Sequence, residues 1–171
     1  LNGLLLIAKP KGPSSHDIIV QVRRWTSQKK VGHTGTLDPM ATGLLVVCLG
    51  VATRLSEYLT SCQKEYRAVV QLGQSTDTYD AEGTVVTSSM SNIPVSIPDQ
   101  MLDQYRGRIQ QEPPAFSAIK KGGQPAYRSA RLGKPIKLEP RAIEVTALTV
   151  VNYQPPELTL TVRCSAGTYI R

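Results

Sequence analysis

The sequence predicts an α+β fold, because it contains both strand and helix periodicities. In residues 157–164 and 64–73, apolar and polar side chains alternate, which is the pattern of strands with one buried face. Near the N-terminus, apolar side chains recur at Ile18, Val22 and Trp25 with helical spacing. We therefore expect a helix with one buried stripe in addition to the strands.

Length and composition are those of one globular domain. A chain of 171 residues can bury about two thirds of its surface, and 40% hydrophobic with 19% charged residues is ordinary for a soluble protein. No apolar run approaches the roughly 20 residues of a membrane span. The three cysteines, Cys48, Cys62 and Cys164, are far apart and lack C-x-x-C spacing. We therefore expect no disulfide framework, no zinc site and a reducing, cytoplasmic location.

The charge balance favours an anionic partner. The chain has 20 basic and 13 acidic residues, so its formal net charge is +7. Such a bias is typical of proteins that bind polyanions, although many basic proteins bind none. Charge alone therefore does not establish nucleic-acid binding.

The first strand and the first helix are joined by a basic turn. Residues 3–8 are expected to form a short strand that ends at Lys9-Pro10-Lys11-Gly12-Pro13. Ser14 or Ser15 can cap the helix, and Asp17 in its first turn suits the helix dipole. Basic residues gather at the far end of this helix: Arg23, Arg24, Lys29 and Lys30. They either complement the dipole or hold phosphate, and the pattern leaves both open.

The stretch from Gly32 to Gly43 is expected to be a rigid, tightly wound loop. Glycine permits close turns, and Pro39 fixes its own φ and restricts Asp38 before it. The loop leads into the apolar run Leu44–Leu49, which is typical of a fully buried strand. A lone acid on a stiff loop is a suitable reactive group. A structural Asx-turn at Asp38 is the alternative, and the loop pattern does not decide between them.

The middle of the chain alternates between helical and extended patterns. Gly50 is expected to open a second helix, whose apolar face carries Leu55, Tyr58 and Leu59. A strand follows with Tyr66 on its core face; such a Tyr usually packs in the core, but it can also stack on a nucleobase. The polar loop 73–83 has three acids within six residues but does not fit an EF-hand. Residues 84–87 complete a hairpin.

The second half contains a helix over residues 98–107, with Met101, Leu102 and Tyr105 directed inward. Residues 108–121 are expected to be irregular to extended, with a basic tip at Lys120 and Lys121. The remaining elements are a short helix over 127–132 that Gly133 ends, and strands over 141–151 and 157–164.

Several motifs, in the same order, resemble those of the TruB-type tRNA pseudouridine synthases. Residues Gly32–Gly43 fit that family's signature G-H-T-G-x-L-D-P-x-A-T-G, whose Asp is catalytic. Other segments resemble further family motifs: the Lys9-Pro10 turn, A-T-[RK] at 52–54, K-x-Y-[RV] at 64–67, T-D-T-x-D-A-x-G at 76–83, Q-x-P-P-x-[FY]-S-A-[LIV]-K at 111–120 and C-x-x-G-T-Y-[IV]-R at 164–171. The resemblance spans Gly3 to Arg171.

This resemblance implies a fold, a reaction and a set of site residues. The fold is the α+β pseudouridine synthase fold, with a mixed, mostly antiparallel sheet, flanking helices and an RNA-binding cleft. The reaction is isomerisation of uridine 55 in the TΨC loop of tRNA by a cytoplasmic, monomeric enzyme without cofactor or metal. Asp38 is the expected catalytic carboxylate, as nucleophile or as base. The expected substrate-binding residues are Tyr66, Arg171, His33, Asp80, Lys9 and Lys120.

The resemblance also suggests individual roles. Arg171 is expected to pair with Asp38, and Asp80 to organise the site by pairing with a nearby basic side chain. Tyr66 is expected to stack on the uracil, and the two lysines to hold the RNA backbone. His33 either fills the gap left by the flipped nucleotide or holds the loop by hydrogen bonds.

Two alternative functions remain open at this stage. A guide-RNA-directed synthase shares the Asp loop but commonly has Ser where Thr34 stands, and a non-catalytic tRNA-binding or folding module would not need Asp38. We expect residues 1–171 to be a catalytic domain that is truncated at its C-terminus, because the family's domain continues beyond the terminal Arg. Many members also carry a C-terminal PUA domain, which has no counterpart in this sequence.

Overall fold

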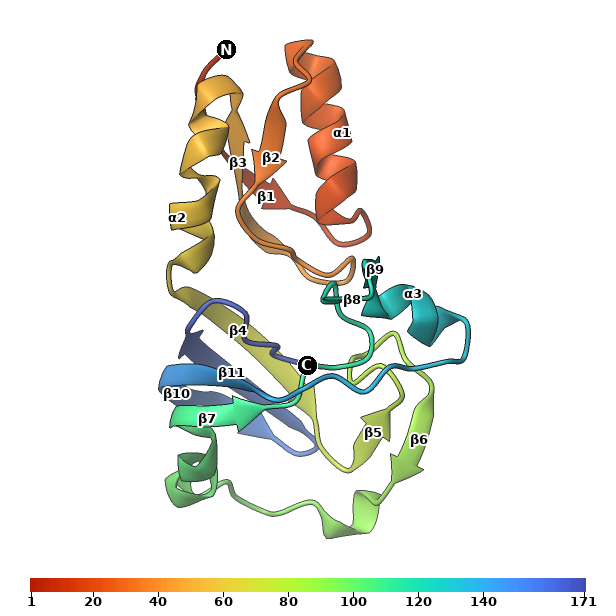
Figure 1. Cartoon of the computed structure of the whole chain (residues 1–171). Coiled ribbons are helices and arrows are strands. Elements are labelled where there is room, and N and C mark those ends of the chain that lie inside the picture. Colours follow the sequence, from red (N-terminus) through yellow and green to blue (C-terminus); the bar gives the residue numbers. More distant parts are fainter. The chain divides into compact units, whose positions relative to one another are not determined.

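The computed structural model describes residues 1–171, which divide into two compact units, Leu1–Cys62 and Gln63–Arg171 (Figure 1). We describe each unit on its own. The expectation of one catalytic domain over the whole chain stays a prediction. No helix combines the length and the apolar character that crossing a membrane requires.

The first unit is built on a three-stranded antiparallel sheet in the order β1-β3-β2. Its strands are β1 (Gly3–Lys9), β2 (Val31–His33) and β3 (Gly43–Leu49). The register pairs Gly3 with Leu49 and Lys9 with Gly43. The end of β1 therefore lies beside the start of β3, which places the basic turn next to the end of the Asp38 loop.

Helix α1 (Ser15–Thr26) begins with a capping box. The Ser14 side chain accepts a hydrogen bond from the Asp17 amide, and the Asp17 carboxylate accepts one from the Ser14 amide. Hydrogen bonds from Ser14 hold the pKa of Asp17 below its ordinary value. The sequence therefore predicted the start of this helix correctly.

Helix α1 covers one face of the sheet, but its buried stripe differs from the prediction. Ile18, Ile19 and Val22 pack with residues of all three strands to form the core of this unit. Trp25 is 73% exposed, so placing it on the buried stripe was wrong. Burial of Ile19 moves the centre of the stripe round the helix, and Trp25 is left at its border in the last turn.

Two other predictions of buried apolar side chains in the first unit were also wrong. Strand β3 is not fully buried, because Leu44 at its start is exposed on the face that α1 does not cover. The next segment is a 3₁₀ helix (Gly50–Leu55) followed by helix α2 (Ser56–Ser61). The tighter winding buries Gly50 and Ala52, and Leu55 and Tyr58 are exposed.

The second unit contains a four-stranded antiparallel sheet in the order β4-β11-β10-β7. Its strands are β4 (Lys64–Gln71), β7 (Gly107–Gln111), β10 (Arg141–Gln154) and β11 (Glu157–Cys164). The inward residues of β11 are those that the alternation predicted: Leu158, Leu160, Val162 and Cys164. Residues 108–111, which were expected to be irregular to extended, form the edge strand β7 together with Gly107, which had been placed at the end of a helix.

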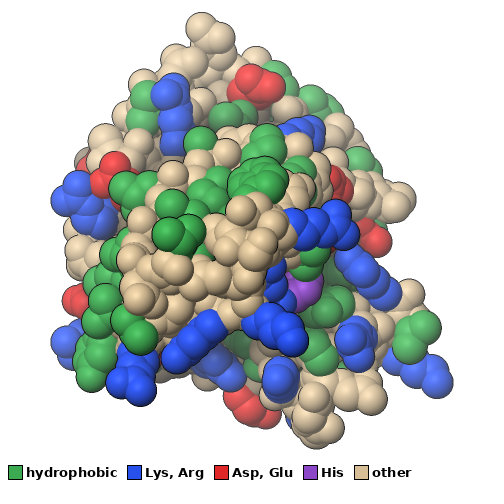
Figure 2. Space-filling model, turned by 90° about the horizontal axis from the view of Figure 1, so that it is seen from above, with side chains coloured by type: hydrophobic (Ala, Val, Ile, Leu, Met, Phe, Trp, Pro, Cys, Tyr) green, Lys and Arg blue, Asp and Glu red, His purple; other side chains and the backbone are tan.

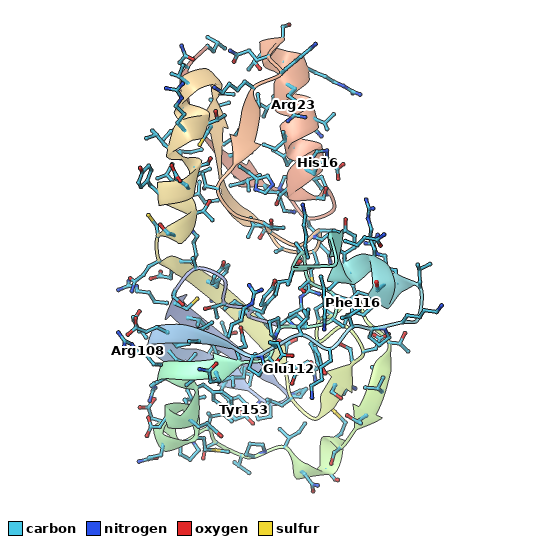
Figure 3. All side chains as sticks on the ribbon, in the orientation of Figure 1. His16, Arg23, Arg108, Glu112, Phe116 and Tyr153 are labelled. Atoms are coloured by element: carbon cyan, nitrogen blue, oxygen red, sulfur yellow. The ribbon has the colours of Figure 1, made fainter.

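Smaller elements connect and extend this sheet. They are the pair β5 (Gln74–Thr76) and β6 (Val85–Ser88), 3₁₀ helices over Met90–Asn92 and Asp99–Tyr105, the pair β8 (Lys120–Lys121) and β9 (Gln124–Pro125), and α3 (Ala126–Arg131). In the 3₁₀ helix Asp99–Tyr105 only Leu102 is buried, so the inward placement of Met101 and Tyr105 was wrong. The Tyr153 hydroxyl donates a hydrogen bond to the Pro94 carbonyl and holds the connecting segment to β10 (Figure 3).

Replacing Val22 and Trp25 separately tests the observed stripe of α1. We expect Val22→Ala to lower the free energy of unfolding by about 2 kcal/mol, because it leaves a cavity in the core. Trp25→Ala should change it by less than about 0.5 kcal/mol, since the indole is exposed. Urea denaturation followed by circular dichroism measures both, and an equal loss in the two variants would contradict this packing.

Candidate active site

Lys9 fastens the Asp38 loop to the end of β1. Its side chain is only 1% exposed. The ammonium Nζ donates to the carbonyls of Pro10 at 3.0 Å, Pro13 at 2.8 Å and Pro39 at 3.2 Å. An ammonium has three N–H donors, so each of them has a carbonyl acceptor. The Pro39 carbonyl also accepts the Gly12 amide at 2.8 Å, which gives this position two anchors.

Ser15 holds the other side of the same loop. Its hydroxyl is buried, donates to the Leu37 carbonyl at 3.1 Å and accepts the Leu37 amide at 2.9 Å. Ser15 is the first residue of α1, so the helix that packs on the sheet also fixes the loop. The residues on both sides of Asp38 are therefore held by hydrogen bonds to the segment 9–15.

Asp38 is half-buried between Leu37, which Ser15 holds, and Pro39, which Lys9 holds; we call these contacts of Lys9 and Ser15 the loop clamp. Its backbone carbonyl accepts the Ala41 amide at 3.0 Å and closes a turn. Burial lowers the pKa of Lys9, and the negative charge of Asp38 acts in the opposite direction and raises it. The loop thus presents a carboxylate that interacts electrostatically with a buried cation on a fixed backbone.

The structure corrects the role expected for Lys9. A phosphate contact requires an exposed ammonium, whereas this ammonium is buried and its hydrogen bonds go to three backbone carbonyls. Lys9 is therefore a residue that positions the loop. Lys11, in the same turn, is the exposed lysine.

His33 lies at the end of β2 and not within the loop, because Val31–His33 pair with β3. The ring is half-buried, and burial lowers the pKa of His33, although a hydrogen bond with the Gly35 backbone partly offsets this. The loop proper starts at Thr34, whose amide donates to the Val46 carbonyl at 3.1 Å. The expected RNA contact of His33 stays a prediction.

In the second unit, Arg171 and Asp80 form a largely buried ion pair. The Arg171 Nη1 lies 2.8 Å from the Asp80 Oδ2, and each side chain is 11% exposed. The same Nη1 donates to the Thr78 carbonyl at 3.5 Å. This is the basic partner that the sequence analysis expected for Asp80. The expected pairing of Arg171 with Asp38 joins residues of different units and stays a prediction.

The segment that carries Arg171 is held by Gln111 at the end of β7. The Gln111 side chain accepts the Tyr169 amide at 2.9 Å and donates to the Tyr169 carbonyl at 2.8 Å. Ile170 packs against the core of this unit. Sequence reasoning gave Gln111 no role, although it is the first residue of the motif that ends at Lys120.

Tyr66 lies on β4 opposite Val162 and packs against the core of the second unit. It is half-buried, so part of the side chain remains accessible. Its contribution to the core is therefore observed, and its stacking on a base stays a prediction.

Lys120 lies in the short pair β8–β9, whose turn contains Gly122 and Gly123, both with positive φ. Lys120 is exposed. The last turn of α3 adds the exposed Arg128 and Arg131, which the sequence analysis did not single out. Lys and Arg side chains are prominent on the face of the protein shown in Figure 2. The phosphate contact of Lys120 stays a prediction.

Comparisons with known proteins agree with the resemblance in the motifs. Two curated relatives, both called tRNA pseudouridine synthase B, are from Yersinia enterocolitica serotype O:8 / biotype 1B and Histophilus somni (strain 2336). They are 45% and 47% identical to this chain over 171 residues, or 52% and 56% of their own lengths. The chain thus spans about half the length of the curated relatives it matches.

A solved structure described as a Cbf5-Nop10-Gar1 complex contains a chain with the same fold. The match has a TM-score of 0.71 and 28% identity, and it covers 99% of this chain and 41% of the other. The predicted α+β pseudouridine synthase fold is therefore confirmed, with antiparallel pairing in every sheet. The sequence model of the TruB family pseudouridylate synthases (N-terminal domain) matches residues 23–170. The chain belongs to this TruB family.

Proposed function

We propose that the protein isomerises uridine to pseudouridine in tRNA, with Asp38 as the catalytic carboxylate. The observation that carries the proposal is the position of Asp38: it lies on a loop clamped by Lys9 and Ser15 in a chain of the TruB family. The relatives named tRNA pseudouridine synthase B, at 45% and 47% identity, support tRNA as the substrate.

The reaction is an exchange of one bond from the ribose to the base for another. The bond between ribose C1′ and uracil N1 breaks, the uracil turns, and a bond forms between C1′ and C5. The C5 proton is lost and N1 gains a proton, so the composition of the RNA is unchanged and no cofactor is consumed. Asp38 acts either as nucleophile or as the base that removes a proton.

A clamped backbone suits this chemistry. The carboxylate must stay within reach of the nucleotide during two bond changes, and errors of about 1 Å in position reduce rates strongly. Hydrogen bonds to Leu37 and Pro39 restrict the backbone on both sides of Asp38. The base has to leave its stack to reach the site, as in other enzymes that act on bases within RNA.

Other side chains complete the proposed site. Arg171, which pairs with Asp80, would supply the positive charge that the family resemblance pairs with Asp38. Tyr66 would stack on the uracil, and Lys120 would hold phosphate. His33 would lie against the RNA as a neutral ring, because burial lowers its pKa.

We further propose that the target is position 55 in the T-arm loop, and that the protein works as a cytoplasmic monomer without a metal. The identity to the tRNA synthases favours a stand-alone tRNA enzyme over a guide-RNA-directed one, because it exceeds the 28% identity to the Cbf5 structure. Thr34, where the guide-directed branch commonly has Ser, agrees with this choice.

The first test compares the parent protein with Asp38→Asn in tritium release from tRNA labelled at C5 of uridine. We expect the substitution to reduce release by at least about 10³-fold, because the amide neither attacks nor removes a proton. Glu57→Gln, an exposed carboxylate of the same unit, is the matched control and should keep full activity. Release by Asp38→Asn at the parent rate would refute the catalytic role. A parent that binds tRNA without release would leave either the non-catalytic module or an incomplete catalytic domain, and the same assay on a longer chain separates the two.

Lys9→Met tests the loop clamp. We expect a loss of about 2–4 kcal/mol in the free energy of unfolding and a lower kcat with little change in KM, because three carbonyls lose their donor. The dependence of tRNA affinity on salt should stay the same, since no phosphate contact is removed. Lys11→Met is the control from the same turn. A salt dependence that falls by about one counterion in Lys9→Met would restore the phosphate role.

His33 should make stability depend on pH. Its pKa in the folded chain lies below the ordinary value of about 6.5, so the unfolded chain takes up a proton first as the pH falls. Stability should therefore decrease as the pH falls below about 6.5, until the folded chain is protonated as well. Urea denaturation from pH 7.5 to 5.5 should show a smaller decrease in His33→Gln than in the parent or in His16→Gln. Equal decreases in all three would exclude this contribution.

A further inference from the structure

We propose that Tyr79 is an additional RNA-binding residue, whose ring stacks on an unpaired base of the substrate beside the Arg171–Asp80 ion pair. This inference rests on the proposed function, because it assumes that the protein binds RNA. Tyr79 stands at the variable position of the loop motif at 76–83, to which the resemblance assigns no role.

The backbone of Tyr79 is strained. Its φ is 58°, and Ser27 is the one other non-glycine residue with a positive φ. Ser27 follows helix α1 as its C-cap, where a left-handed conformation is usual. Tyr79 caps no helix, and a bulky residue in this region costs about 1–3 kcal/mol.

The surrounding loop enforces this conformation. The Thr76 hydroxyl donates to the Asp80 carbonyl at 2.7 Å, and the Thr78 hydroxyl donates to the Asp80 carboxylate at 2.7 Å. The Tyr79 amide itself donates to the Thr76 carbonyl at 3.2 Å. A Cβ on Gly83 would lie 2.2 Å from the Thr78 hydroxyl oxygen, so the loop is closed tightly at its other end. Residues 76–83 thus hold Tyr79 in place from both sides.

The ring of Tyr79 contributes little to the stability of the fold. The side chain is 62% exposed, and it takes part in no hydrogen bond, ion pair or ring contact. A glycine would adopt the same backbone without strain. A rigid loop that displays a large aromatic ring toward solvent, at a cost in stability, indicates a use of the ring outside the folded chain.

The charges around Tyr79 favour a base as its partner over a phosphate. Arg171 neutralises Asp80, but Asp77 and Glu82 remain exposed in the same loop. These carboxylates repel a phosphate, whereas the face of a nucleobase is uncharged. Stacking of an unpaired base on an aromatic ring contributes about 1–3 kcal/mol. Tyr79 follows Thr78, whose carbonyl Arg171 contacts, so a base on this ring would lie beside the Arg171–Asp80 ion pair of the same unit.

The test measures binding of a tRNA T-arm hairpin to the intact protein by fluorescence titration at several salt concentrations. The variants are Tyr79→Gly, which removes both ring and strain, and Tyr79→Phe, which keeps the ring. Tyr105→Ala is the matched control, because Tyr105 is a comparably exposed tyrosine of the same unit. Lys120→Met serves as the comparison for a phosphate contact.

We expect Tyr79→Gly to weaken binding about tenfold at every salt concentration and to be at least as stable as the parent in urea. Tyr79→Phe and Tyr105→Ala should bind within twofold of the parent. Lys120→Met should instead lower the salt dependence by about one counterion. Loss of a stacking ring therefore leaves the salt dependence of tRNA affinity unchanged, whereas loss of a phosphate contact reduces it.

The proposal is overturned if Tyr79→Gly binds within twofold of the parent, if Tyr79→Gly is less stable than the parent, or if Tyr79→Phe binds as weakly as Tyr79→Gly. Binding of a peptide or protein partner that depends on Tyr79, with RNA affinity unchanged, would assign the ring to that partner. If the parent binds no tRNA and releases no tritium, the proposed function fails as well, whereas an active parent with an unaffected Tyr79→Gly refutes the stacking alone.

Discussion

The buried ammonium of Lys9 is the interaction on which the geometry of the first unit depends. Burying a cation is costly unless its donors are satisfied, and here the three N–H groups meet three carbonyls. Two of these carbonyls belong to the turn after β1, and the third belongs to Pro39 in the Asp38 loop. One charge therefore joins two segments that are 30 residues apart in the sequence.

The sheet register makes this junction possible. Because β1 and β3 are antiparallel, Lys9 lies opposite Gly43, where the loop enters β3. Ser15 then holds Leu37 from the first residue of α1, whose apolar stripe is fixed in the core. Core packing, helix start and loop are thus coupled, and a carboxylate on the loop inherits the rigidity of the sheet.

Sequence patterns predicted the elements better than they predicted exposure. The alternation in β11 and the capping residues of α1 gave correct boundaries and faces, because both depend on neighbouring residues alone. Trp25, Leu44 and Leu55 were placed inside but are exposed. Burial of a residue depends on whether another element covers it, and a local period does not contain that information.

For the candidate site residues, too, the sequence predicted which residues matter better than it predicted their surroundings. The motifs located Asp38, Asp80 and Arg171, and the ion pair between the last two is present. They did not reveal that Lys9 is buried, because a lysine before a proline reads the same in the sequence whether its side chain points to solvent or to backbone carbonyls. The role of Gln111 was missed for the same reason, since its partner is a backbone 58 residues away.

In both units, hydrogen bonds from a charged side chain fix the position of a loop. In each unit a buried or largely buried cation holds a loop that carries a candidate site residue: Lys9 donates to carbonyls beside Asp38, and Arg171 pairs with Asp80 and donates to the Thr78 carbonyl. Charged hydrogen bonds are stronger and more directional than apolar contacts, so they fix position more tightly than a core of the same size. Apolar packing would keep these loops folded, but the proposed reaction breaks and remakes a glycosidic bond and would need its carboxylate in one place, which favours buried or largely buried charges at these two loops.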